Sequence, residues 1–179
     1  MSRRTKDSRQ QIFNRILLVA ILVIIVAVAA YAFTRPTSVA LPDYLDRCIP
    51  IAGGTFAYHS VPQLRITIRG QNLTIPANIG IVGTCVRPIH TFTPTGTIHI
   101  DTDVDRNYTL GDFFLVWGNT FGVRYGTFNQ NQIFNFQTDS THSLTMKVNN
   151  QTNTDFQNLV FPKNSNSTTN PFQVAIAYG

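Results

Sequence analysis

An unbroken run of eighteen apolar residues, from Ile16 to Phe33, constrains this chain more than any other feature of its sequence. Arg15 precedes the run, and Thr34-Arg35-Pro36 follow it. At about 1.5 Å of rise per residue, a helix from Ile16 to Thr34 is roughly 28 Å long, close to the thickness of a bilayer's hydrocarbon core. The sequence therefore predicts one transmembrane helix over residues 16–34.

The distribution of charge predicts how such a helix is oriented. Residues 1–15 carry a net charge of +4, whereas the residues after Phe33 carry a net charge of only +1. By the positive-inside rule the tail stays in the cytoplasm and the C-terminal part is exported. Because the exported part is nearly neutral, the basic composition does not indicate nucleic-acid binding, and we expect no nucleic-acid partner.

A cleaved signal peptide is the alternative to a membrane anchor. The triplets Ala27-Val28-Ala29 and Ala30-Tyr31-Ala32 have the small residues that a cleavage site needs. The apolar run is longer than an ordinary signal core, however, and aromatic residues stand at its far end, as they do at a membrane interface. We therefore expect a basic cytoplasmic tail (1–15), a membrane helix (16–34), a linker (35–47) and an extracytoplasmic domain (48–179).

The exported part contains two cysteines, Cys48 and Cys85. An even number of cysteines outside the cytoplasm favours a disulfide, and two free buried thiols are the alternative. Four Asn-X-Ser/Thr sequons also fit an exported surface and are candidate glycosylation sites. They lie at Asn72, Asn107, Asn150 and Asn166.

Alternating apolar and polar residues predict a β-rich domain. The alternation is clear over 63–70 and 172–178, and Gly70-Gln71-Asn72 predicts a hairpin turn into 73–75. Further strands are expected over 96–101, 120–125, 133–137, 143–148 and 156–161. One short helix is expected to begin after Thr109 as its N-cap and to end at Gly118.

The expected fold class is therefore α+β. An N-terminal transmembrane helix precedes a mostly antiparallel β domain, either a sheet or a small sandwich, with one short helix packed on it. A grasp-like arrangement is one way to build such a domain.

Motifs of the common hydrolases and phosphate-binding enzymes are missing from the sequence. There is no Gly-X-Ser-X-Gly elbow, no His-Glu-X-X-His, no glycine-rich phosphate loop with its lysine, and no glutamate anywhere. A Cys48–Cys85 disulfide would also remove both thiol nucleophiles. We therefore expect a protein that is not an enzyme.

Histidines carry the remaining chemistry. Imidazoles that converge outside the cytoplasm are natural ligands for copper or zinc. His90 and His99 flank a Pro-Thr-Gly turn that can bring them together, and with His59 they form the predicted metal-ligand set. A purely structural, hydrogen-bonded role for each histidine is the alternative. Asp101, Asp103 and Asp105 have only the spacing of a calcium loop, because its glycine and bidentate glutamate are absent.

Several segments together resemble a group of exported, membrane-anchored proteins of bacteria and archaea that have no assigned activity. The resemblance covers residues 48–118, and its residues include Cys48, Tyr58-His59, Ile75-Pro76-Ala77-Asn78-Ile79-Gly80, Cys85, Ile89-His90-Thr91, Gly96-Thr97-Ile98-His99-Ile100, Leu110-Gly111-Asp112-Phe113-Phe114 and Trp117-Gly118. Members of that group carry further histidines where this chain has Val61, Gln63 and Phe92. If the group's pattern is a metal site, this chain keeps only His59, His90 and His99 of it.

The function expected first is that of a single-span membrane protein whose exported domain binds a partner without catalysis, as an accessory subunit of a membrane complex. Its partners would be the lipid bilayer and other membrane protein subunits. An extracytoplasmic copper- or zinc-binding domain is the second hypothesis. A cell-envelope adhesion or surface-layer module is the third.

Overall fold

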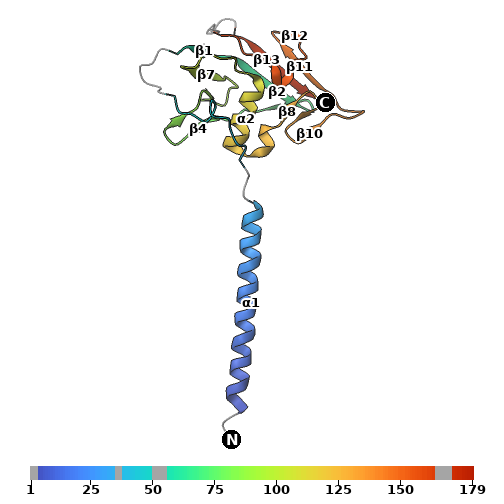
Figure 1. Cartoon of the computed structure of the whole chain (residues 1–179). Coiled ribbons are helices and arrows are strands. Elements are labelled where there is room, and N and C mark those ends of the chain that lie inside the picture. The colour runs from blue at the N-terminus through green and yellow to red at the C-terminus, as the bar shows by residue number, and fades with distance from the viewer. Residues whose placement is uncertain (1–3, 35–37, 50–55, 164–170) are drawn as a thin grey trace. The chain divides into compact units, whose positions relative to one another are not determined.

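The computed structural model describes residues 4–34, 38–49, 56–163 and 171–179, with the side chains of the first helix described at 13–28 and 31. The chain divides into two compact units, Met1–Pro36 and Thr37–Gly179. Figure 1 shows the elements of both, from the N-terminal helix to the last strand.

The described residues of the first unit form one helix, α1 (Arg4–Thr34). Its described apolar side chains are exposed, among them Leu18, Leu22 and Val26. In the part of the chain that the structure describes, no helix combines the length and apolarity needed to cross a membrane. The helix is therefore present, but the transmembrane span expected over 16–34 is not confirmed.

The second unit is a mixed α+β domain whose sheets are mostly antiparallel, as expected. Its largest sheet has five strands in the order β12-β11-β13-β2-β3. Their bounds are β2 (Gln63–Ile68), β3 (Gln71–Leu73), β11 (Leu144–Val148), β12 (Gln151–Thr152) and β13 (Gln173–Tyr178). Only the β13–β2 pairing in this sheet is parallel. Arg69 and Gly70, both at positive φ, form the tight turn of the β2–β3 hairpin.

Period-two alternation selects the core face of this sheet. In β13 the odd-numbered residues are exposed, whereas Val174, Ile176 and Tyr178 are buried. Val174 pairs with Leu64, and Ile176 with Ile66, so the apolar residues of neighbouring strands form continuous rows. The strands expected over 63–70, 143–148 and 172–178 are confirmed within a few residues.

Three smaller antiparallel sheets complete the domain. The first has the order β1-β7-β6, with β1 (Tyr58–Ser60), β6 (Ile89–His90) and β7 (His99–Thr102). The second has the order β10-β9-β8, with β8 (Phe128–Asn129), β9 (Gln132–Ile133) and β10 (Phe136–Gln137). The third pairs β4 (Ile81–Val82) with β5 (Cys85–Val86).

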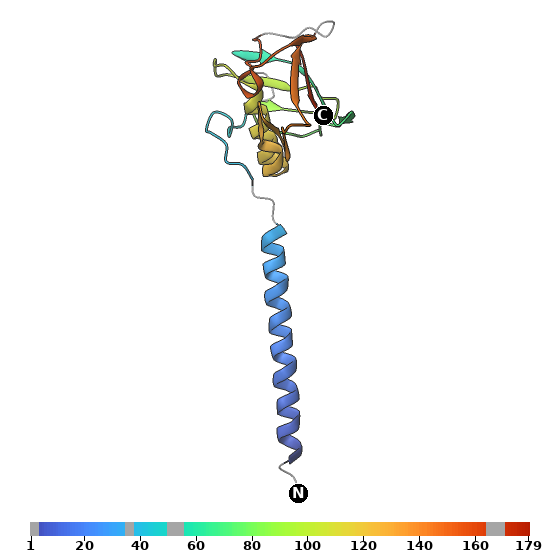
Figure 2. The ribbon, with the colours of Figure 1, turned by 90° about the vertical axis from the view of Figure 1, so that its right-hand side faces the viewer.

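The helix α2 (Leu110–Phe121) packs into the core of the domain. Thr109 and Asp112 form a reciprocal capping box, which satisfies N–H groups that the first turn leaves free. Its buried face presents Phe113, Phe114 and Trp117 to the core, and Figure 2 shows the helix beside the strands from a second direction. The helix continues three residues beyond Gly118, the residue expected to end it.

Two expected strands are wrong, and the strand expected over 133–137 is interrupted by a turn between β9 and β10. The segment 120–125 instead completes α2 and forms a 3₁₀ turn, η1 (Val123–Gly126), because Gly122 at φ 111° reverses the chain there. The segment 156–161 begins with the 3₁₀ turn η2 (Phe156–Asn158), in which Phe156 takes a positive φ, and then makes a single bridge from Val160 to Thr109. Both apolar patterns reflect packing against α2 rather than strand pairing.

The residues just before Cys48 belong to the domain. Leu45 is fully buried, the Tyr44 hydroxyl donates a hydrogen bond to Asp112 in α2, and Asn119 donates one to the Val39 carbonyl. Within the interval expected to be a linker, Leu45 thus belongs to the core, and Leu41 and Tyr44 pack against it. We call residues 38–49 the entry segment. The Cys48–Cys85 disulfide is formed and joins this entry segment to β5.

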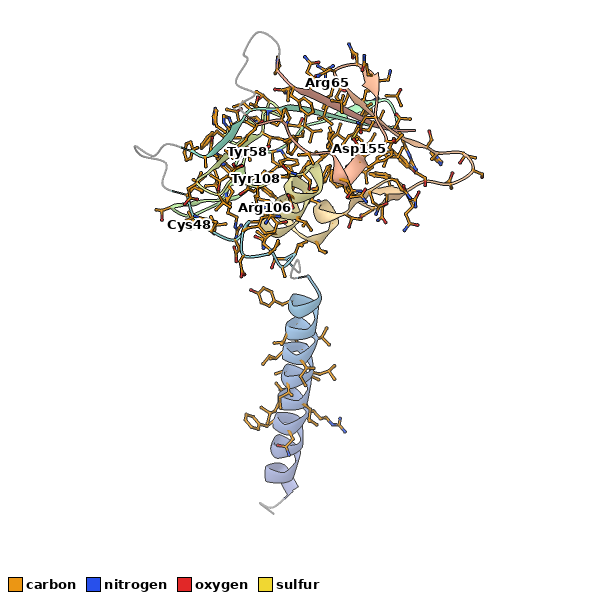
Figure 3. The ribbon with its side chains drawn as sticks, turned by 45° about the horizontal axis from the view of Figure 1, so that its top comes forward. Cys48, Tyr58, Arg65, Arg106, Tyr108 and Asp155 are labelled. Carbon is orange, nitrogen blue, oxygen red and sulfur yellow. A yellow bond between two sulfur atoms is a disulfide. The ribbon has the colours of Figure 1, made fainter. Side chains whose placement is uncertain are left out.

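Aromatic packing fixes the entry segment further. The Arg106 guanidinium lies 3.3 Å from the centre of the Tyr44 ring, and the rings of Tyr58 and Tyr108 meet edge to face at 5.2 Å. Figure 3 labels Cys48, Tyr58, Arg106 and Tyr108 in this part of the domain.

Candidate metal site

The β1-β7-β6 sheet places four titratable side chains on one face. His59 is the cross-strand partner of Asp101, and His90 is the partner of His99. His99 and Asp101 are two residues apart on β7, so both point to the same side of the sheet. The three predicted histidines therefore lie around one carboxylate.

The opposite face of this sheet explains its orientation. It carries Tyr58, Ser60, Ile89, Ile100 and Thr102, each at most 2% exposed. Tyr58, Ile89 and Ile100 belong to the hydrophobic core of the domain, so this face of the sheet packs into that core. The alternation of the strands then directs the histidines and Asp101 away from the core.

His90 is held in one tautomer by the backbone. Its Nδ1 lies 2.9 Å from the carbonyl oxygen of Arg87, which can only accept, so Nδ1 carries the hydrogen. The side chain is 1% exposed. Among the residues that the structure describes, Nε2 has no hydrogen-bond partner. A buried lone pair is thus left on Nε2, the arrangement found in metal-binding histidines.

Burial keeps the imidazoles uncharged. It lowers the pKa of His90 from 6.5 to about 4, against opposing contributions from Asp101 and the Arg87 carbonyl. It also lowers the pKa of His99, again against the attraction of Asp101. At neutral pH both rings are neutral, which is the form that binds metal ions.

Asp101 faces the lone pair of His90. Its Oδ2 lies 3.7 Å from His90 Nε2, too far for a hydrogen bond, and both atoms are acceptors. Two acceptors directed at a common point are stabilised by a cation between them. Two ligand atoms on a tetrahedral zinc ion are roughly 3.4 Å apart, given bond lengths of about 2.0–2.1 Å, so the separation suits a bridging metal ion.

His99 completes a set of three donors. Its ring lies nearly parallel to that of His90, with ring centres 5.5 Å apart. One ligand atom from each of His90, His99 and Asp101 lies within 4.8 Å of the other two. Two neutral imidazoles and a carboxylate form a donor set that zinc, copper(II) and iron(II) all accept.

His59 holds a different position from the one expected. Its Nδ1 donates to Oδ1 of Asp101, and its ring stacks on Phe56 with ring centres 6.5 Å apart. It therefore orients the carboxylate and lies outside the three-donor group. The fourth histidine, His142, is also outside the group, with its Nδ1 3.0 Å from Oδ1 of Asp139.

Asp101 is the site residue that sequence reasoning missed. Its spacing to Asp103 and Asp105 suggested only an incomplete calcium loop. Asp103 pairs with Arg47 and Asp105 with Lys163, so these two carboxylates are neutralised by other partners. The useful signal was the alternation of β7, which puts Asp101 on the same face as His99.

The other predicted modification sites are distributed over the domain. Asn72, Asn107 and Asn150 are exposed, as a glycosylation acceptor must be. Asn166 lies outside the described residues. These positions leave glycosylation a prediction.

Comparison with known proteins adds no further constraint. The chain matches no protein-family model, no curated protein and no solved structure. Membership of the group of membrane-anchored proteins that residues 48–118 resemble therefore stays a prediction. Phe92 packs its ring against those of both His90 and His99.

Proposed function

We propose that the exported domain binds one divalent transition-metal ion, zinc or copper(II), through His90, His99 and Asp101. The observation that carries the proposal is the buried Nε2 of His90, which lacks a hydrogen-bond partner among the described residues and faces Oδ2 of Asp101. A carboxylate ligand and the absence of any free cysteine favour these ions over copper(I), which prefers sulfur ligands.

Metal analysis of the purified full chain tests this proposal. After equilibration with zinc or copper(II) and removal of loosely bound ions, we expect close to one ion per chain. His90→Ala removes a ligand and should weaken binding at least about a hundredfold, more than the 10–100-fold typical of residues that only support a ligand.

His142→Ala is the matched control. It also removes a histidine that pairs with an aspartate, but at a position outside the three-donor group. It should retain the ion. Absence of stoichiometric zinc and copper in the unmutated chain would refute the proposal, as would equal losses in His90→Ala and His142→Ala.

We also propose that α1 tethers this domain to a membrane, where it serves as a non-catalytic accessory subunit of a larger complex. Support comes from the apolar sequence of Ile16–Phe33, from the basic residues before it, and from the exposure of its described apolar side chains. Exposed apolar patches of this size are costly in water and are typical of sites covered by lipid or protein.

Extraction tests this second proposal. The full chain should stay with the membrane fraction at high salt and alkaline pH, and it should co-purify with other subunits in mild detergent. Release by salt alone would contradict the tether, and migration as a lone monomer would contradict the accessory role.

A further inference from the structure

The three-donor group contains fewer protein ligands than a closed metal site needs. Structural zinc sites have four protein ligands, whereas sites with three hold water or an exchangeable ligand at the fourth position. In the described residues, the group of potential ligands comprises His90, His99 and Asp101 alone. The remaining residues of the chain, 1–3, 35–37, 50–55 and 164–170, include no histidine, cysteine, aspartate or glutamate.

His59 is the nearest candidate for a fourth ligand, and its geometry argues against that role. Its Nδ1 is committed to Oδ1 of Asp101, the carboxylate oxygen that does not face His90. Neither ring nitrogen of His59 belongs to the group of ligand atoms within 4.8 Å of one another, so the ring would have to move from this hydrogen bond and from its stacking on Phe56 to join that group. Ligating carboxylates are commonly hydrogen-bonded by residues outside the ligand set, and His59 fits that role.

The burial of the donors indicates on which side the free position lies. His90 is 1% exposed and Asp101 is 8% exposed, so these two ligands close the inner side of the site. His99 is only partly buried, and Phe92 beside it is 46% exposed. The Phe92 ring makes T-shaped contacts with the rings of His90 and His99, with ring centres 4.6 Å and 5.0 Å apart. The open side of an ion held by these residues would therefore face outward, past His99 and Phe92.

The charge of the site selects the kind of ligand that enters. A divalent ion with two neutral imidazoles and one carboxylate keeps a net charge of +1. An anion would neutralise that charge, and a single open coordination position accepts one donor atom, so the ligand would be monodentate. The ligand would enter by displacing a metal-bound water molecule, with no change in oxidation state.

We infer that the ion held by His90, His99 and Asp101 keeps one coordination position open to solvent and binds small monodentate anions there. This inference rests on the proposed metal-binding function. It goes further in stating that the site exchanges ligands and is not purely structural. Small carboxylates and inorganic anions are the chemical class that fits.

Cobalt(II) makes the open position visible, because its absorption bands in the visible range respond to each change of ligand. The full chain in detergent is loaded with cobalt(II) and titrated with sodium azide at constant ionic strength. We expect a saturable change in the visible spectrum with a single dissociation constant. The same response is expected in the His142→Ala variant, since His142 pairs with Asp139 outside the three-donor group.

The outcomes distinguish failure of this inference from failure of the metal-binding proposal on which it rests. If the chain binds no cobalt(II), no zinc and no copper(II), the metal-binding function itself fails. If cobalt(II) binds stoichiometrically but azide leaves its spectrum unchanged, the site is closed and only the inference is overturned. An azide response that appears only after His59→Ala would identify His59 as the fourth ligand and would also overturn it.

Discussion

At the scale of single residues, His59 illustrates how a side chain could affect the proposed metal ion without being one of its ligands. Its hydrogen bond holds Asp101 in the rotamer in which Oδ2 faces Nε2 of His90. Without that bond the Asp101 carboxylate can rotate toward water and adopt other rotamers. The same logic applies to the Arg87 carbonyl, which fixes the tautomer of His90.

We therefore predict that His59→Ala weakens zinc binding without abolishing it. A loss of about 10- to 100-fold is expected, the range seen when residues that support metal ligands are removed. Isothermal titration with zinc measures it, with His142→Ala as the control. A loss as large as that of His90→Ala would mean that His59 is a ligand.

Tyr58 gives a prediction about alkaline pH. Burial raises its pKa from 10.0 to about 12, with smaller contributions from Tyr108 and Asp105, and its hydroxyl donates to the Phe161 carbonyl. The folded state thus favours the neutral phenol. The resulting stability is fully present below pH 10, the ordinary pKa of tyrosine, and is lost as the pH rises toward 12.

Tyr58→Phe should unfold with a weaker pH dependence between pH 10 and pH 12 than the unmutated chain. At pH 8 it should be less stable by about 1 kcal/mol, because the Phe161 carbonyl loses its donor. Urea unfolding of both proteins at several pH values measures the difference. Parallel pH profiles would show that Tyr58 does not carry the effect.

At the scale of elements, α2 depends on a contact that the helix pattern does not reveal. Gly118 lies inside the helix, where alanine is ordinarily preferred by about 1 kcal/mol. A Cβ built at this position, however, would lie 2.5 Å from the Cα of Gly126 in η1 and 2.7 Å from Val39 Cγ2. The helix, the 3₁₀ turn and the entry segment therefore meet at a place that only glycine fits.

Gly118→Ala should destabilise the domain by at least about 2 kcal/mol despite its better helix propensity, since overpacking of this kind moves backbone. Thr109→Ala, which removes the helix cap, should cost only about 1 kcal/mol. Urea midpoints of the two variants give the comparison. If Gly118→Ala were more stable than the unmutated protein, η1 would have to move aside for the new methyl group without a loss of stability.

At the scale of the whole molecule, the disulfide ties the entry segment to the domain. Cys48 and Cys85 are 37 residues apart, and closing a loop of that length contributes about 3 to 4 kcal/mol in the chain-entropy model. The bond stands at the end of a segment that buries Leu45 and Ile49. It thereby keeps the first residues of the second unit attached to the rest of it.

Reduction of the disulfide, or the Cys48→Ser and Cys85→Ser double variant, should lower the free energy of unfolding by about 3 kcal/mol. Thermal unfolding with and without a strong reductant measures the loss. The histidines of the site and Asp101 lie on the β1-β7-β6 sheet, whereas Cys85 lies on β5. Zinc binding by the folded reduced protein should therefore be unchanged. An unaltered melting temperature would show that entry-segment packing alone is sufficient.

Much of the fold could be predicted because its signals are local. Residues 172–178 alternate without a break, so any sheet that buries one face of them gives the β13 that is observed. Thr109 and Asp112 form a capping box from residues three apart. The segments 120–125 and 156–161 misled because apolar residues that pack on a helix from a turn resemble a short strand when only the sequence is read.

By itself, the sequence determined the apolar helix, the alternating strands, the pair of cysteines and the three histidines of interest, because each depends on residues near one another in the chain. Tertiary structure decided that Asp101 joins His90 and His99 while His59 supports it. Cross-strand register pairs His59 with Asp101 and His90 with His99, and register is set by core packing on the opposite face of the sheet. Burial, which keeps the two imidazoles neutral and leaves Nε2 of His90 without a protein partner among the described residues, also arises only when that sheet closes over the core.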